Sequence, residues 1–124
     1  MRSTRHSKYN INYHLVWILK YRHPVLTGDV AVHLTDILHL IAEKKGIEIL
    51  SLEIMPDHIH IFVSSPPQNA PSLLVNWFKG ISARMYNYWH EGPKIRWTNS
   101  YYVGTAGTVT AETIKRYIEN QTKI

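Results

Sequence analysis

Residues 47–64 read IEILSLEIMPDHIHIFVS, and this stretch decides the fold. Apolar and β-branched residues lie on both sides of a short segment, residues 55–57, that contains a proline and an aspartate. This pattern predicts two strands, residues 47–54 and 58–64, joined by a turn. We expect the two strands to pair in the antiparallel sense, because the connection between them is so short.

The second of these strands carries two histidines at the spacing of a strand face. Side chains alternate across a strand, so His58 and His60 should share one face while Ile59 and Ile61 point to the other. Two imidazoles at this spacing can converge on one divalent metal ion, although two solvated strand histidines would give the same pattern. Such a site leaves room for oxygen ligands, which Mg²⁺ or Mn²⁺ accept.

Outward from this hairpin, the periodicity predicts helices and strands in alternation. The expected elements are a strand over residues 9–19, a helix over 29–45, a helix over 71–89, a strand over 95–103 and a last helix from Thr110 to about Gln121. Residues 104–107, which include two glycines, are expected to form a flexible connector before the last helix.

The order β-α-β-β-α-β-α predicts an α+β fold. Its first six elements match the ferredoxin-like βαββαβ motif, an antiparallel sheet with two helices on one face, and the seventh is an appended helix. The apolar side chains of Ile59, Ile61 and Val63 suit the helix-covered face. His58 and His60 are therefore expected on the opposite face, which only the extra helix or a partner can cover.

Composition sets wider limits. The chain has 124 residues, so we expect residues 1–124 to form a single domain. It has no cysteine, which excludes disulfides and thiolate-bound zinc, and no apolar run of membrane-spanning length. The basic N-terminus lacks the apolar stretch of a signal peptide, so a cytoplasmic location is the default expectation.

The formal net charge is +5, and there are eight histidines in addition. A basic surface favours a polyanionic partner such as nucleic acid, although many basic domains bind nothing acidic. Basic and aromatic residues also interleave near the N-terminus and around Tyr21, a mixture that suits single-stranded nucleic acid. The candidate DNA contacts are Arg2, Arg5, Lys8, Lys20, Arg22, Lys79 and Arg84.

The last predicted helix contains a second pair of candidate site residues. Tyr117 and Gln121 are four apart and therefore lie on one helix face. Tyr117 is either an amphipathic anchor beside Ile114 and Ile118 or a nucleophile. A phenol has a pKa near ~10, so a nucleophilic role needs a cation at the reacting phosphate, and Gln121 is placed to help bind that cation.

Asp57 directly precedes the two histidines. Its carboxylate either orients an imidazole through a hydrogen bond or only shapes the turn after Pro56.

With these residues laid out, the chain resembles the single-tyrosine HUH transposases, the TnpA proteins of small prokaryotic insertion sequences. HUH denotes histidine, a bulky apolar residue and histidine, here His58-Ile59-His60. The resemblance covers nearly the whole chain and includes YHLVW at 13–17, KYRHPVL at 20–26, MPDHIH at 55–60, WFKG at 77–80, YVGT at 102–105 and YIENQ at 117–121.

The resemblance implies a chemistry for these residues. His58, His60 and Gln121 would hold one divalent ion, Mg²⁺ or Mn²⁺, and Tyr117 would attack a DNA phosphate to form a 5′-phosphotyrosine link. The substrate would be single-stranded DNA with a hairpin near each element end. The protein would act as a homodimer, because moving an element requires two cuts, and no nucleotide cofactor would be needed.

Two other functions stay open at the level of sequence. One is a domesticated HUH nickase, which neighbouring DNA would distinguish from a mobile element. The other is a non-catalytic nucleic-acid-binding module on the same ferredoxin-like scaffold, which would bind DNA without forming a covalent adduct.

Overall fold

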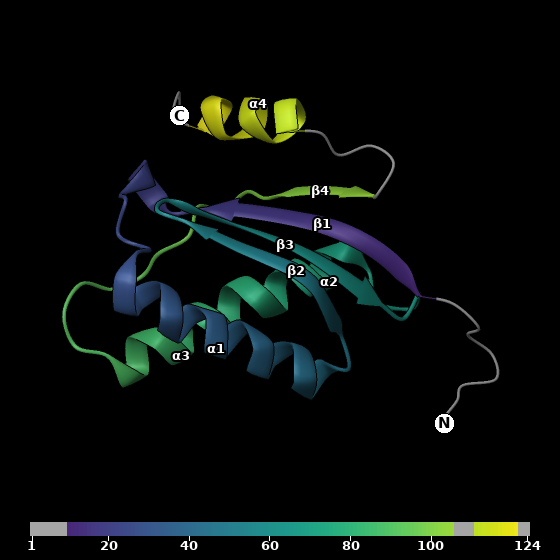
Figure 1. The fold of residues 1–124 in the computed structure, drawn as a ribbon, viewed down its shortest axis with the longest axis horizontal. Coiled ribbons are helices and arrows are strands. Elements are labelled where there is room, and N and C mark those ends of the chain that lie inside the picture. The colour runs from purple at the N-terminus through teal and green to yellow at the C-terminus, as the bar shows by residue number, and fades with distance from the viewer. Residues whose placement is uncertain (1–9, 106–110, 122–124) are drawn as a thin grey trace.

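The computed structural model describes residues 10–105 and 111–121. The strands and outer helices are β1 Ile11–Ile18, α1 Gly28–Lys45, β2 Glu48–Met55, β3 His58–Ser65, β4 Tyr102–Thr105 and α4 Ala111–Gln121. The strands form one antiparallel sheet in the order β2-β3-β1-β4, the order of a ferredoxin-like fold. Figure 1 shows α1, α2 (Pro71–Asn76) and α3 (Ser82–Trp89) on one face of this sheet and α4 on the other. The predicted fold class is confirmed.

Strand β3 lies inside the sheet, between β2 and β1, and its two faces differ in chemistry. Ile59, Ile61 and Val63 have no exposed surface and belong to the core beneath the helices. His58 and His60 alternate with them and therefore face α4. The expected placement of the two histidines on the face away from the helix layer is correct.

The predicted helix over residues 71–89 is present as one continuous helical run with a change of winding. It comprises α2 Pro71–Asn76, a π-helical segment Trp77–Ile81 and α3 Ser82–Trp89. Phe78, in the π-helical segment, is fully buried and its ring stacks on Trp17 of β1 at 6.2 Å between centroids. None of the helices in the described ranges combines the length and the apolar character that crossing a membrane requires.

The strand predicted over residues 95–103 is wrong in its bounds. Trp97 forms only an isolated bridge with Leu19, and the regular strand β4 is Tyr102–Thr105. The carbonyl oxygens of Thr98 and Ser100 accept hydrogen bonds from the Lys79 ammonium, which draws the backbone out of the regular ladder.

The connector expected over residues 104–107 is wrong for its first two residues. Gly104 and Thr105 complete β4 opposite β1, whereas positions 106 and 107 lie outside the described residues. The first strand begins at Ile11 in the structure, after the irregular Asn10, and Tyr9 and the expected helix cap Thr110 lie outside the described residues.

The burial of one face of β3 predicts that a substitution on that face lowers stability more than one at an exposed position of β2. Ile61→Ala should lower the free energy of unfolding by about 2–5 kcal/mol, because it leaves a cavity in the centre of the core. Leu50→Ala is the matched control, since Leu50 is 42% exposed beside an irregularity in the β2–β3 pairing. Denaturant unfolding measures both, and equal losses for the two variants would contradict the assignment of faces.

Candidate active site

A chain of polar contacts orients His58. The Nδ1–H of His58 donates to Asp57 Oδ1 at 2.8 Å, and Arg22 Nε donates to Asp57 Oδ2 at 2.8 Å. Burial opposes ionisation of Asp57, but the hydrogen bonds from His58 and Arg22 and the guanidinium charge lower its pKa overall. A carboxylate can only accept, so the proton of neutral His58 lies on Nδ1 and its Nε2 keeps a free lone pair.

His60 is held by a different set of partners. Its Nε2 lies 2.9 Å from His14 Nδ1, and its Nδ1 lies 3.5 Å from Glu53 Oε1. Burial lowers the pKa of His60, which the Glu53 carboxylate opposes only in part, and burial followed by repulsion from His60 lowers the pKa of His14. Both imidazoles are therefore neutral at pH 7, as metal ligation requires.

Sequence reasoning missed His14. It belongs to β1, pairs with Phe62 across the ladder and stacks on that ring at 4.0 Å between centroids. From this position it reaches the diagonal neighbour His60 on the same sheet face. The alternation of residues 11–18 identifies the face of His14 within its own strand, but only the pairing register with β3 brings it to His60.

Tyr117 of α4 lies over the segment that leads into β4. Its hydroxyl is 3.2 Å from Ser100 Oγ, and its ring centroid is 6.0 Å from that of Tyr102. Burial raises the pKa of Tyr117, and side-chain hydrogen bonds with Ser100 and Thr98 only partly oppose this. A phenol is protonated at neutral pH in any case, and this position makes the Tyr117 hydroxyl harder still to deprotonate.

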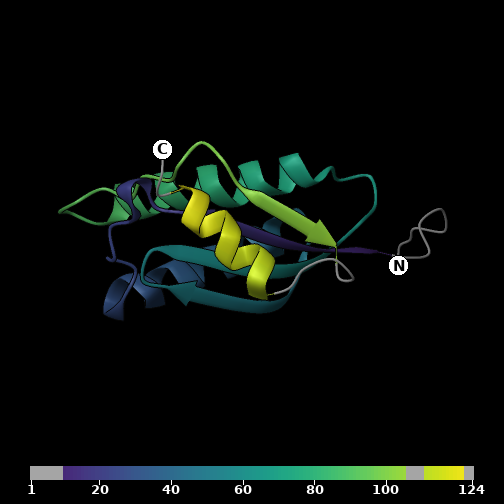
Figure 2. The same cartoon turned by 90° about the horizontal axis from the view of Figure 1, so that it is seen from above.

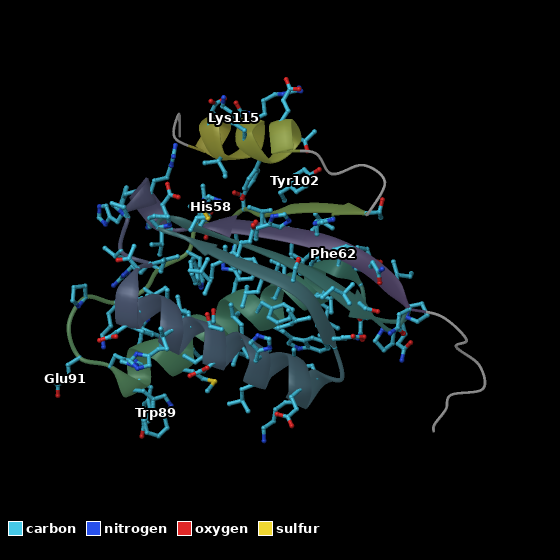
Figure 3. The ribbon with its side chains drawn as sticks, viewed as in Figure 1. His58, Phe62, Trp89, Glu91, Tyr102 and Lys115 are labelled. Atoms are coloured by element: carbon cyan, nitrogen blue, oxygen red, sulfur yellow. The ribbon has the colours of Figure 1, made fainter. Side chains whose placement is uncertain are left out.

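The histidines and the tyrosine lie on the same face and at the same end of the sheet. His58 pairs with Ile18 of β1, and the Ile18 carbonyl oxygen accepts a hydrogen bond from the Thr98 amide on the other side. Figure 2 shows α4 crossing the strands obliquely above this end, and Figure 3 shows His58 on the side of the sheet that faces α4. Within the described residues, the contacts of Tyr117 run to residues 98–102, not to the imidazoles.

The described residues fit a divalent ion in part. His58 has its Nδ1 held by Asp57, so its Nε2 is oriented outward, and His60 is neutral. An ion at His60 Nε2 would have to replace or share the contact with His14. No group of three His, Cys, Asp or Glu side chains in residues 10–105 and 111–121 is arranged to hold a metal. Gln121 ends α4, and its side chain lies outside the described part.

The basic residues predicted to contact DNA are placed differently from one another. Arg22 is engaged with Asp57, and Lys79 points inward to the carbonyls of Thr98 and Ser100. Lys20 and Arg84 are exposed. Arg2, Arg5 and Lys8 lie outside the described residues. A DNA contact stays a prediction for each of them, and Lys79 has an internal role in addition.

Comparison with protein families relates these features to known proteins. Residues 7–121 match the family described as "Transposase IS200 like". The chain is 40% identical to the ISDra2 transposase TnpA of Deinococcus radiodurans, over 98% of this chain and 91% of that protein. It is 32% identical to the transposase for insertion sequence element IS200 of Salmonella typhimurium, over 97% of this chain and 82% of that protein.

Solved structures show the same fold. A crystal structure of a candidate transposase from Deinococcus radiodurans superposes with a TM-score of 0.85 at 39% identity, covering 98% of each chain. A REP-associated tyrosine transposase bound to a REP hairpin gives a TM-score of 0.62 at 12% identity, covering 96% of this chain and 68% of that one. At that identity the second likeness concerns the fold alone.

The contacts of Lys79 predict a structural role. Lys79→Met should lower the free energy of unfolding by about 1–3 kcal/mol, because two backbone carbonyls lose a charged donor. Arg84→Met, on the exposed side of the same helical run, should change it by less than about 0.5 kcal/mol. Thermal and denaturant unfolding measure both. An unchanged Lys79→Met stability with weakened DNA binding would instead assign Lys79 to DNA.

Proposed function

Because the chain belongs to the IS200-like transposase family, we propose that it cleaves and rejoins single-stranded DNA at the ends of an insertion sequence, with Tyr117 as the nucleophile. The observation that carries the proposal is the placement of an oriented histidine pair and a tyrosine on one face and one end of the sheet. Phosphoryl transfer needs little covalent chemistry beyond positioning and charge stabilisation, so such a placement is what the reaction requires.

The proposed step is an in-line displacement at one DNA phosphate. The phenolic oxygen of Tyr117 forms a bond to phosphorus, and the bond from phosphorus to the 3′ oxygen breaks. The phenolic proton is lost, the departing 3′ oxygen gains a proton, and the 5′ phosphate remains esterified to Tyr117. The phosphotyrosine ester keeps the energy of the phosphodiester, so a 3′-hydroxyl can later reverse the reaction without a nucleotide cofactor.

In this proposal His58, His60 and Gln121 hold the divalent ion, Mg²⁺ or Mn²⁺. When bound, the ion would supply charge stabilisation at the scissile phosphate. The chain's own contribution is to keep His60 neutral through burial and, through Asp57, to orient the His58 ring with Nε2 outward. The hydrogen bond from His58, together with the hydrogen bond and charge of Arg22, lowers the pKa of Asp57 and so favours the ionised carboxylate.

The half-buried phenol suggests how the reaction is controlled. Tyr117 is packed against Ser100 and its pKa is raised, so it must leave this position, or receive a phosphate and a cation beside it, before it can react. A shift of α4 over its own sheet or onto that of a second subunit would serve. We therefore propose a homodimer that handles two element ends, either with each tyrosine acting in its own subunit or with the tyrosines exchanged.

End hairpins complete the proposed substrate. This expectation comes from the sequence resemblance, and a REP-associated tyrosine transposase with the same fold was solved with a hairpin bound. The competing function is a non-catalytic DNA-binding module, which the raised pKa and internal hydrogen bond of Tyr117 would also suit.

Covalent trapping separates the two functions. With labelled hairpin DNA and Mg²⁺ or Mn²⁺, the wild type should give an adduct that survives a denaturing gel, and Tyr117→Phe should give none. His58→Ala and His60→Ala should each abolish the adduct while hairpin binding persists, because the imidazoles act on the reacting phosphate rather than on the hairpin. Binding without any adduct would favour the module, and cleavage by both histidine variants would remove the metal site from the mechanism.

The Arg22–Asp57–His58 contacts predict a specific metal defect. Asp57→Asn should raise the metal concentration for half-maximal adduct formation by about 10–100-fold, with recovery at high metal, because the proton position of His58 is no longer fixed. Glu53→Gln is the control, since Glu53 is largely exposed and lies 3.5 Å from His60, and it should have a smaller effect. Equal metal requirements for Asp57→Asn and wild type would refute this role.

A further inference from the structure

The turn Lys20–Arg22, directly after β1, has an unusual backbone. Tyr21 has φ 62° and Arg22 has φ 52°, in the left-handed region that bulky residues rarely adopt. The surrounding backbone holds the turn in place, because the Leu19 amide donates to Asp57 O and the Lys20 amide donates to Arg96 O, both at 2.9 Å. Strain of this kind persists only where neighbouring contacts impose it, and it often marks a functional site.

The side chain of Tyr21 gains no packing from this conformation. It is 77% exposed, although glycine or asparagine would suit the same backbone better. Its ring lies 5.6 Å from Lys20 Nζ and 5.8 Å from the ring centre of His23. The turn therefore presents an aromatic face to solvent beside a cation, which is the combination that single-stranded nucleic acids bind.

The position of the turn connects it to the candidate active site. Arg22, the next residue, donates to the carboxylate that orients His58, so the turn and the histidine are joined through two contacts. Figure 1 shows this dark-blue segment beyond the end of the sheet, near the C-terminal end of α4. Arg96 is exposed, and its backbone pairs with Lys20, which adds positive charge to the same end.

We propose that Tyr21 is a stacking platform for a base of the single-stranded DNA that passes the active site, with Lys20 contacting the adjoining phosphate. The inference rests on the proposed function, because it takes single-stranded DNA as the substrate. It adds a base-binding position to that site and explains why a bulky aromatic occupies a backbone conformation that disfavours it.

The test compares two DNA probes of equal length. One is a single-stranded (dT) 20-mer, and the other is the same phosphate backbone without bases. The affinity for the (dT) strand divided by the affinity for the abasic strand is the stacking ratio, because only the bases differ. The wild type should bind the (dT) strand more tightly. Tyr21→Asn should reduce that ratio by about 5- to 100-fold, the range for losing an aromatic contact to a base, while affinity for the abasic strand stays nearly constant. Tyr21→Trp should preserve the ratio.

The controls separate stacking from folding and from chemistry. Asparagine tolerates the left-handed region, so Tyr21→Asn should melt at the wild-type temperature or above it. Tyr88→Asn replaces an aromatic that is 81% exposed on α3, on the opposite side of the sheet from α4, and should leave the ratio unchanged. Tyr117→Phe should lose the covalent adduct but keep the ratio.

Each outcome decides one of the two proposals. A wild-type ratio near one, an unchanged ratio in Tyr21→Asn, or equal losses for both probes would overturn the stacking role. A preserved stacking ratio in a wild type that forms no adduct would overturn the proposed chemistry and leave the stacking role standing.

Discussion

The structure depends on strand β3, whose one face packs in the core beneath the helices while the other faces α4. Strand β3 is hydrogen-bonded on both edges, to β1 and β2, so its backbone groups are satisfied and its register is fixed. The buried isoleucines on one face lock that register, because a shift by one residue would expose them and turn the histidines into the core. The same burial that stabilises the domain therefore holds His58 and His60 toward α4.

The turn between β2 and β3 extends this control to the surrounding loops. The backbone oxygens of Pro56 and Asp57 accept hydrogen bonds from the amides of Leu26 and Leu19, which fixes the chain on either side of the Lys20–Arg22 turn. The Asp57 side chain joins Arg22 to His58 in the same place. One residue thus acts through its backbone on the shape of a loop and through its carboxylate on the orientation of an imidazole. A charge-conserving replacement of Asp57 by glutamate would preserve neither the 2.8 Å distance from the carboxylate to Arg22 Nε nor the 2.8 Å distance to His58 Nδ1, because the side chain is longer.

Much of this could be predicted from the sequence, because it depends on local periodicity. The alternation in residues 58–64 predicted the faces of His58 and Ile59 correctly, and the order of elements predicted the sheet and its helix layer. The errors arose where distant residues decide the outcome. The predicted fourth strand began too early because Lys79 takes the carbonyls of Thr98 and Ser100, and His14 was missed because only the register of β1 against β3 brings it to His60. The strained turn at Tyr21 has no local sequence signal either, since its backbone is imposed by contacts with Asp57 and Arg96.

If Tyr117 is the nucleophile, as we propose, its packing in this fold opposes its reactivity. Residues 98–100 lie between Lys79, which holds their carbonyls from the helix layer, and Tyr117, whose hydroxyl meets Ser100 from α4. Burial raises the pKa of Tyr117 and so makes its hydroxyl harder to deprotonate, yet a nucleophile has to reach phosphorus with its oxygen free. In the proposed mechanism both requirements are met if the docked position is one of two states of α4 and the DNA favours the other, or if a phosphate and a cation reach the docked phenol. If Tyr117 has to be released in this way, the free energy of its contact with Ser100 would set how strongly substrate must bind first, and the helix contact would be part of the control of the reaction.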